Sequence, residues 1–388
     1  MKITHLCFVS LFSDGYSYQE NILPLYHKKL GHDVSVIASQ QVYDERGELG
    51  FTDKTVYRNE YGIPVLRLKY KKPLKIYVRF RRFAGMYEAL EKAAPDVLFI
   101  HGCQFMDIDV VVKFLKRHPH VSVYVDNHSD FSNSARNWLS LNILHKIFWR
   151  RCARMILPLA TKFYGVLPAR VDFLKEVYGI PEDKINLLLM GAEDDLAASA
   201  CRPEVRSKIR KRYNIENDDF LIVTGGKIDS FKRQTLLLMD AVKRLNDPKV
   251  RLILFGSIIP ELEGEVTKRL GSVCQYIGWI ESADSYEIFA ASDLVVFPGR
   301  HSVFWEEVAG LGRPMVCKLW KGTTHIDIGG NVKFIEQDSV DAIFNILKEL
   351  RGNPEEYGRM KEAASGMGKE KFSYLNIAKK SLGESSEP

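Results

Sequence analysis

Short runs of β-branched and aliphatic residues alternate along the whole chain with longer stretches of helical period. This is the βαβ rhythm of a parallel sheet with helices on both faces. In the N-terminal half it predicts strands at Ile3–Ser10, Asp33–Ala38, Val65–Leu68, Val97–His101, Ser122–Asp126, Met155–Leu157 and Ile185–Leu189. In the C-terminal half the series restarts with Leu221–Thr224, Arg251–Phe255, Cys274–Ile277, Leu294–Phe297 and Met315–Cys317. The sequence therefore predicts an α/β protein with two doubly wound, Rossmann-like domains.

The length of 388 residues also suits two domains, and 46% hydrophobic residues suffice for two cores. We expect an N-terminal domain at 1–192, a linker at 193–203 and a C-terminal domain at 204–370. Residues 371–388 are expected to form a C-terminal helix and tail that cross back to the N-terminal domain. No strand is expected in the segment Pro354–Glu384, which has the pattern of two helices.

Apolar runs in this sequence stay well short of the roughly 18 to 20 residues that span a bilayer. The six cysteines lie far apart, without the spacing of a zinc site or a disulfide framework. We therefore expect a cytoplasmic protein with reduced thiols.

A charged segment interrupts the N-terminal half. Between Lys69 and Arg82 there are seven basic residues and no acidic one. If Pro73 opens a helix that runs to Ala93, then Lys75, Arg79 and Arg82 share one face. Such a face suits an anionic membrane surface or acceptor, although a merely solvated helix remains the alternative. The protein would then be peripheral on the inner face of the cell membrane. Nucleic-acid binding is not expected, because no recognition module accompanies the charge.

A glycine turn follows the first strand of the C-terminal half, in TGGKIDSFKR (Thr224–Arg233). Gly225 and Gly226 allow a sharp turn at the carboxyl end of the sheet, where open α/β sheets bind ligands. Lys227 and Lys232 could neutralise a diphosphate there. The alternative is a turn followed by a solvated basic helix start.

A second motif, FPGRHSVFWEEVAGLGRPMVC (Phe297–Cys317), has the pattern of strand, turn, helix and glycine break. Ser302 is predicted to cap the helix, which would leave free N–H groups for phosphate or sugar oxygens. One turn later, Glu306 or Glu307 could accept hydrogen bonds from a ribose diol, or the pair could simply be solvated.

Two further motifs follow strands of the N-terminal half. In VDNHSD, His128 lies just past a strand end and could act as acid, base or hydrogen-bond partner, or be a loop histidine. His101 competes for that role, but is expected to be a satisfied structural group. Gly15 lies in the turn between the first strand and the first helix, where a simple βα loop is the alternative.

Taken in this order, the motifs resemble those of the retaining nucleotide-sugar glycosyltransferases of family 4, including bacterial capsule and surface-polysaccharide enzymes. The resemblance covers nearly the whole chain, including FYGVLPARVDFLKEVYGIPEDKINLLLMGAED (Phe163–Asp194). It implies the GT-B fold, in which two Rossmann-like domains face each other across a cleft. It also implies that Lys227 and Lys232 hold the donor diphosphate, that Glu307 binds the donor ribose, that His128 lies near the reacting sugar and that Gly15 lies beside the phosphates.

One position departs from the family pattern. The family has a second Glu eight residues before the ribose Glu, where this chain has Gly299 in a shorter loop. We expect the turn Gly299–Ser302 and the His301 side chain to take over contacts to the donor sugar.

The resemblance implies transfer of a hexose from a nucleoside-diphosphate-sugar to a glycan or lipid-linked acceptor in bacterial surface polysaccharide synthesis. Because the lysines can stabilise the leaving diphosphate, neither a metal nor another cofactor is expected. The alternatives are a nucleotide-sugar epimerase of the same shape and a non-catalytic nucleotide-sugar binding protein. An NAD oxidoreductase is disfavoured, because no glycine fingerprint follows the first strand.

Overall fold

The computed structural model describes residues 1–43, 48–72, 78–230 and 232–384. These form two compact units. Unit 1 comprises Met1–Leu189 together with Ile377–Pro388, and unit 2 comprises Met190–Asn376. The division after Leu189 lies slightly before residue 192, where the sequence pattern placed it. In the expected linker the chain is helical and belongs to unit 2, with α7 at Asp194–Ala200 and α8 at Pro203–Arg212.

Unit 1 is built on an eight-stranded sheet in the order β10-β9-β8-β7-β1-β2-β6-β5. Only the edge strand β5 is antiparallel to its neighbour. The strands are β1 Lys2–Cys7, β2 Asp33–Ser39, β5 Val56–Arg58, β6 Pro64–Leu68, β7 Val97–His101, β8 Ser122–Asn127, β9 Lys162–Gly165 and β10 Ile185–Leu187. A separate antiparallel pair joins β3 Gln41–Tyr43 to β4 Leu49–Phe51.

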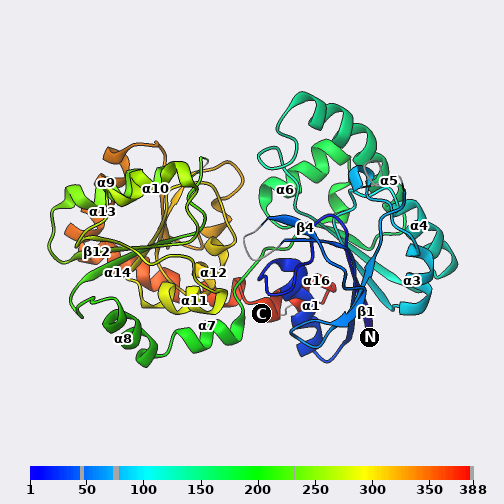
Figure 1. Cartoon of the computed structure of the whole chain (residues 1–388), viewed down its shortest axis with the longest axis horizontal. Helices are drawn as coiled ribbons and strands as arrows, with labels where there is room; N and C mark the ends of the chain where they lie inside the picture. The colour runs from blue at the N-terminus through cyan, green and yellow to red at the C-terminus, as the bar shows by residue number, and fades with distance from the viewer. Residues whose placement is uncertain (44–47, 73–77, 231, 385–388) are drawn as a thin grey trace. The chain divides into compact units, whose positions relative to one another are not determined.

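Side chains alternate between the two faces of this sheet. One face carries Leu6, Leu98 and Val123 into the main core, together with side chains of α3 (Met86–Ala93), α4 (Ile108–Arg117) and α5 (Arg150–Ile156). The other face is covered by α1 (Gln19–Lys29) and α16 (Tyr374–Ser381), and Figure 1 shows these two groups of helices on opposite sides of the sheet. The remaining helical segments of unit 1 are η1 Ser140–Trp149, α6 Pro168–Phe173, η2 Leu174–Tyr178 and η3 Glu182–Lys184.

Two predicted elements of unit 1 are wrong. Residues 73–77 of the helix expected over Pro73–Ala93 lie outside the described residues. Among the described ones, residues 78–80 are helical, Arg81 interrupts the helix with φ +53°, and α3 starts only at Met86. The strand expected at Met155–Leu157 is the end of α5, and the next apolar run, Lys162–Gly165, pairs with β8 instead. The second error arises because a short apolar run fits a helix as well as a strand.

Unit 2 contains a six-stranded parallel sheet in the order β13-β12-β11-β14-β15-β16. Its strands are β11 Phe220–Gly225, β12 Val250–Phe255, β13 Cys274–Tyr276, β14 Leu294–Phe297, β15 Met315–Lys318 and β16 Val332–Ile335. One face packs against α9 (Gln234–Leu245) and α13 (Val340–Gly352). On the other face α11 (Ser282–Ala291) lies beside α8 and α12 (Phe304–Gly310). The predicted fold class is confirmed in both units.

The C-terminal segment contains three helices rather than the two expected: α14 Pro354–Ser365, α15 Gly368–Lys371 and α16. The other helical elements of unit 2 are α10 Pro260–Thr267 and η4 Thr324–Ile326. Residues from Ile377 onward return to unit 1. None of the helices in the described ranges has a stretch of sufficient length and hydropathy to span a bilayer.

Candidate functional site

A pocket in unit 2 brings together the two motifs that the sequence singled out. β11 ends at Gly225, where a Cβ atom would lie 2.2 Å from the ring of Phe255, and Gly226 follows with φ +116°. The pocket is lined by residues of both motifs, among them Gly226, Lys227, Lys232, Gly299 and Ser302. Gly225 is therefore needed because a side chain there would clash with Phe255, and Gly226 because its positive φ favours glycine.

Lys227 and Lys232 give this pocket its charge. Lys227 is exposed, whereas burial lowers the pKa of Lys232. A lysine that is partly removed from water gains more from an anion beside it than an exposed one does. This pair at the carboxyl edge of a parallel sheet can hold a diphosphate.

Glu307 on α12 is buried, with 1% of its surface exposed. Burial raises the pKa of its carboxyl group well above the ordinary value, and Glu193 and Glu306 add to the effect. Its Oε2 atom has no hydrogen-bond partner among the described residues. A buried acceptor without a partner is costly, so Glu307 is suited to receive a hydroxyl group from a ligand.

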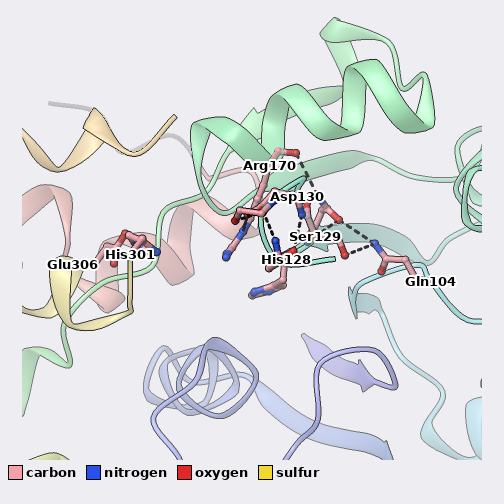
Figure 2. Close-up of polar contacts among 10 residues, drawn as sticks. Gln104, His128, Ser129, Asp130, Arg170, His301 and Glu306 are labelled. Atoms are coloured by element: carbon pink, nitrogen blue, oxygen red, sulfur yellow. Dashed lines mark hydrogen bonds and ion pairs between the residues drawn. The ribbon is translucent and has the colours of Figure 1, made fainter. Parts of the chain in front are cut away.

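The neighbouring Glu306 has a different environment. Its Oε1 atom lies 2.8 Å from Nε2 of His301 and 2.8 Å from Nε2 of His325, and Figure 2 shows His301 beside it. Burial would raise the pKa of Glu306, but the two imidazoles outweigh it and lower the pKa to about 2. The sequence indicated His301 but not His325, which lies nineteen residues after Glu306 and comes close only through folding.

The predicted cap at Ser302 is wrong. α12 begins at Phe304, its N-cap residue is Val303, and no side chain caps it. Gly310 in the same helix packs closely, because a Cβ there would lie 2.5 Å from the Cβ of Ala192.

In unit 1, His128 follows β8 in a loop held by many hydrogen bonds. Asn133 donates to the His128 carbonyl, and Asp130 accepts from the backbone of Ser132 and Asn133 (Figure 2). The His128 Nε2 atom lies 3.2 Å from Asp126 and 3.8 Å from Glu20. Burial alone would lower the pKa of His128, but these two carboxylates outweigh it and raise the pKa. The imidazole therefore keeps its positive charge to higher pH than a free histidine.

A buried chain of histidines leads away from His128, which we call the histidine chain: His101, His5 and His27. His101 Nδ1 donates to Asp126 at 2.8 Å, because a carboxylate only accepts. His101 Nε2 lies 3.0 Å from His5, and His5 lies 3.0 Å from His27. His27 in turn contacts Ser381 of α16 at 2.8 Å. His101 is thus the satisfied structural group that the sequence indicated. The spacing of His5 and His27 in the sequence did not predict their contacts in this chain.

The remaining predicted residues are placed as follows. Gly15 lies in the turn after β1 with φ +79°, and its backbone N–H donates to Glu60. Lys75 lies outside the described residues. Arg79 is exposed, but Arg82 is paired with Asp107 and Asp109. The proposed basic face of one helix is therefore wrong, because the helix breaks and Arg82 is neutralised by acids of α4 and its N-cap.

Two groups of side chains in the described ranges converge closely enough to be considered as metal ligands, with ligand atoms within 4.8 Å of one another: Glu20, His101 and His128, and His301, Glu306 and His325. In the second group both imidazoles already share Glu306 at hydrogen-bond distance. That no metal takes part stays a prediction.

A family model described as Glycosyltransferase Family 4 matches residues 25–195. No curated protein matches the sequence. Among solved structures, Anabaena HepE in complex with UDP matches with a TM-score of 0.69 and 16% identity over 99% of both chains. WaaG, a glycosyltransferase involved in lipopolysaccharide biosynthesis, matches with a TM-score of 0.67 and 13% identity over 99% of this chain and 100% of that one. The UDP-GlcNAc 2-epimerase from Neisseria meningitidis, solved with UDP-GlcNAc bound, matches with a TM-score of 0.64 and 14% identity. The match covers 99% of this chain and 100% of the epimerase chain.

Proposed function

We propose that this chain, which has the GT-B fold, is a glycosyltransferase of family 4, the family whose model matches residues 25–195. The donor is a nucleoside-diphosphate-sugar, and the acceptor is a hydroxyl group of a glycan or a lipid-linked glycan. The anomeric configuration is retained and the sugar is a hexose. The neighbour WaaG supports a role in bacterial surface polysaccharide synthesis.

The observation that carries this proposal is that unit 2 contains both a dibasic pocket and a buried carboxyl oxygen, Oε2 of Glu307, without a hydrogen-bond partner among the described residues. Lys227 and Lys232 line the pocket beside the glycine turn, and α12 carries Glu307. The lysines bind the diphosphate, and Glu307 accepts hydrogen bonds from the ribose hydroxyls. The site therefore offers a nucleotide positive charge for its diphosphate and a hydrogen-bond acceptor for its ribose hydroxyls.

The chemistry follows from the leaving group. When the bond between the anomeric carbon and the diphosphate breaks, negative charge develops on the diphosphate. Lys227 and Lys232 are already in place to stabilise that charge, so the reaction needs no metal and no further cofactor. In unit 1 His128, whose pKa is raised, donates a hydrogen bond to a hydroxyl group of the reacting sugar.

The basic stretch of unit 1, residues 69–82, supports a second part of the proposal. In this part the protein binds an anionic membrane surface from the cytoplasmic side. Lys69, Lys72 and Arg79 of this stretch are exposed. Each basic residue near such a surface contributes roughly 1 kcal/mol. Replacing Lys69 and Lys72 by Gln should reduce sedimentation with phosphatidylserine vesicles, and unchanged sedimentation would remove this part.

Nucleotide binding tests the donor site directly. HepE was solved with UDP, so UDP is titrated first, followed by GDP and ADP, with calorimetric detection. We expect one nucleoside diphosphate to bind and Glu307→Gln to weaken it by about tenfold, because an amide replaces the carboxyl group that accepts from the ribose hydroxyls. Glu355→Gln is the matched control, because Glu355 is an exposed acid of α14. Equal affinity in wild type and Glu307→Gln would refute the assignment of the ribose site.

A nucleotide-sugar epimerase is the second candidate, favoured by the similarity to the Neisseria meningitidis enzyme. An epimerase converts the donor without an acceptor, whereas a transferase consumes it only with one. Incubation of the protein with a UDP-sugar alone, followed by chromatography of the nucleotide sugars, distinguishes the two. Binding without turnover under every condition would instead indicate a nucleotide-sugar binding protein.

A further inference from the structure

Unit 1 contains a second cavity, of about 200 Å³, which we call the arginine cavity. It lies at the carboxyl edge of the sheet, where residues that follow β1, β7 and β8 meet the segment η1. Its lining includes Arg79, Arg81, Gln104, Ser129, Leu144 and Trp149. It is larger than the engineered cavity of about 150 Å³ that holds benzene, so a single sugar ring fits.

Arg81 lies in this cavity in an unusual conformation. Its φ of +53° is rare for a residue with a side chain, and its guanidinium group lies 5.7 Å from the ring centre of Trp149. One nitrogen donates to the Gln104 carbonyl at 2.7 Å. The fold therefore holds this side chain in a fixed position at the cavity wall.

Arg81 also lacks an acidic counterpart in the part of the chain that the structure describes. Within the described ranges, no carboxylate forms an ion pair with it, and the groups that favour its charged form are the phenols of Tyr70 and Tyr178. Burial lowers the pKa of Arg81. A guanidinium that is withdrawn from water without a carboxylate is stabilised by an anion that binds beside it.

Other polar groups of the cavity suit the rest of a sugar. Arg79 adds a second guanidinium group, and Ser129, Ser134 and Ser140 contribute hydroxyl groups. The side-chain oxygen of Gln104 is buried and has no hydrogen-bond partner among the described residues. Leu144 and Trp149 supply an apolar wall.

The cavity also adjoins the loop of His128. Gln104 donates to Asn127 at 3.0 Å and lies 3.4 Å from the Ser129 hydroxyl, as Figure 2 shows for Gln104 and Ser129. Ser129 follows His128 directly in the chain. A ligand in the cavity is thus bound next to the histidine to which the proposed reaction assigns a contact with the reacting sugar.

We propose that the arginine cavity is an acceptor subsite for an acidic sugar, whose phosphate or carboxylate group binds Arg79 and Arg81 while its hydroxyl groups bind the serines and Gln104. This inference rests on the proposed function and defines its acceptor as anionic. Bidentate contacts from arginine suit both kinds of oxyanion.

The test is calorimetric titration without donor, with three probes: glucose 6-phosphate, glucuronate and uncharged glucose. At least one acidic probe should bind more tightly than glucose. Arg81→Gln and Arg79→Gln should each weaken it about tenfold or more, as expected for loss of a charged hydrogen bond. Preference for glucose 6-phosphate identifies a phosphate as the acceptor group, and preference for glucuronate identifies a carboxylate.

Three further variants locate the binding. Arg154→Gln removes an exposed arginine of α5 outside the cavity and should change nothing. Arg81→Lys keeps the charge but not the bidentate geometry, so its affinity should lie between wild type and Arg81→Gln. Lys232→Ala in unit 2 should also leave the acidic probe bound.

Two results would overturn the inference. One is equal affinity for glucose and both acids, and the other is wild-type affinity in Arg79→Gln, whose exposed side chain can be replaced without loss of the fold. Loss of binding in Lys232→Ala with retention in both arginine variants would assign the anion to the unit 2 pocket instead. A separate UDP titration reports on the donor site. Absence of acceptor binding in the arginine cavity can therefore be distinguished from failure of the proposed function.

Discussion

Lys232 is the single residue on which the proposed chemistry depends most. It lines the unit 2 pocket, and burial lowers its pKa. Lys232→Ala should lower turnover about a hundred- to a thousandfold, because one preorganised contact to the developing charge is worth roughly 3 to 4 kcal/mol. Steady-state kinetics with a sugar nucleotide measures this loss. Lys211→Ala, on the exposed surface of α8, is the control, and equal rates in both variants would remove Lys232 from the mechanism.

His301 tests the position at which the family pattern and this chain differ. His301 belongs to the turn Gly299–Ser302, and its Nε2 atom lies 2.8 Å from Oε1 of Glu306, with 12% of the side chain exposed. His301→Ala should weaken binding of the sugar nucleotide by about 0.5 to 1.5 kcal/mol, the value of one hydrogen bond to a neutral hydroxyl group, and leave the free diphosphate nearly unaffected. Calorimetry with both ligands measures the difference. Parallel losses would make His301 a positioning residue for Glu306 rather than a sugar contact.

At the scale of elements, two helical glycines of unit 2 should respond to substitution in opposite directions. In α12 a Cβ on Gly310 would lie 2.5 Å from Ala192, whereas in α10 a Cβ on Gly264 meets no atom within 4 Å. Gly310→Ala should cost about 1 to 3 kcal/mol through overpacking. Gly264→Ala should stabilise by about 0.5 to 1 kcal/mol, because alanine favours the helix. Urea unfolding measures both, and a stable Gly310→Ala would show that α12 can shift.

Elements whose signals are local could be predicted from the sequence. The strand Leu221–Thr224 was predicted to within one residue at each end, because its apolar run and the glycine turn follow one another directly in the chain. The helix over Pro73–Ala93 failed at Arg81, whose positive φ is imposed by its contacts with Gln104 and Trp149. The same limit applies to the site, since Lys227 and Lys232 are five residues apart whereas His325 and the histidine chain converge only through the fold.

At the scale of the whole molecule, buried histidines make the stability of unit 1 dependent on pH. Burial is the main cause that lowers the pKa of His27 to about 3 and that of His145 to about 4. The unfolded chain takes up protons on both below about pH 6.5, and the folded chain does not until these lower values. Stability should therefore fall as pH decreases from about 6.5 towards 4, by about 2 kcal/mol per histidine at pH 5.

A pair of variants isolates this effect. His27→Gln should reduce the difference between the urea midpoints at pH 7 and pH 5, because it removes one buried group that must stay neutral. His120→Gln, at an exposed histidine before β8, should leave the difference as in wild type. Hydrogen exchange of peptides from β1 and β7 confines the measurement to unit 1. An identical pH dependence in all three proteins would contradict the expectation.

The return of the C-terminal segment to unit 1 has a consequence for how the protein is made. His27 contacts Ser381, the Tyr124 hydroxyl donates to the Leu382 carbonyl and the Tyr164 hydroxyl donates to that of Lys380. These partners are synthesised after all of unit 2, although N-terminal domains generally fold first during translation. Unit 1 therefore waits on the ribosome with one face of its sheet covered by α1 but not yet by α16, and a messenger that ends before α16 yields a chain in which His27, Tyr124 and Tyr164 lack these partners.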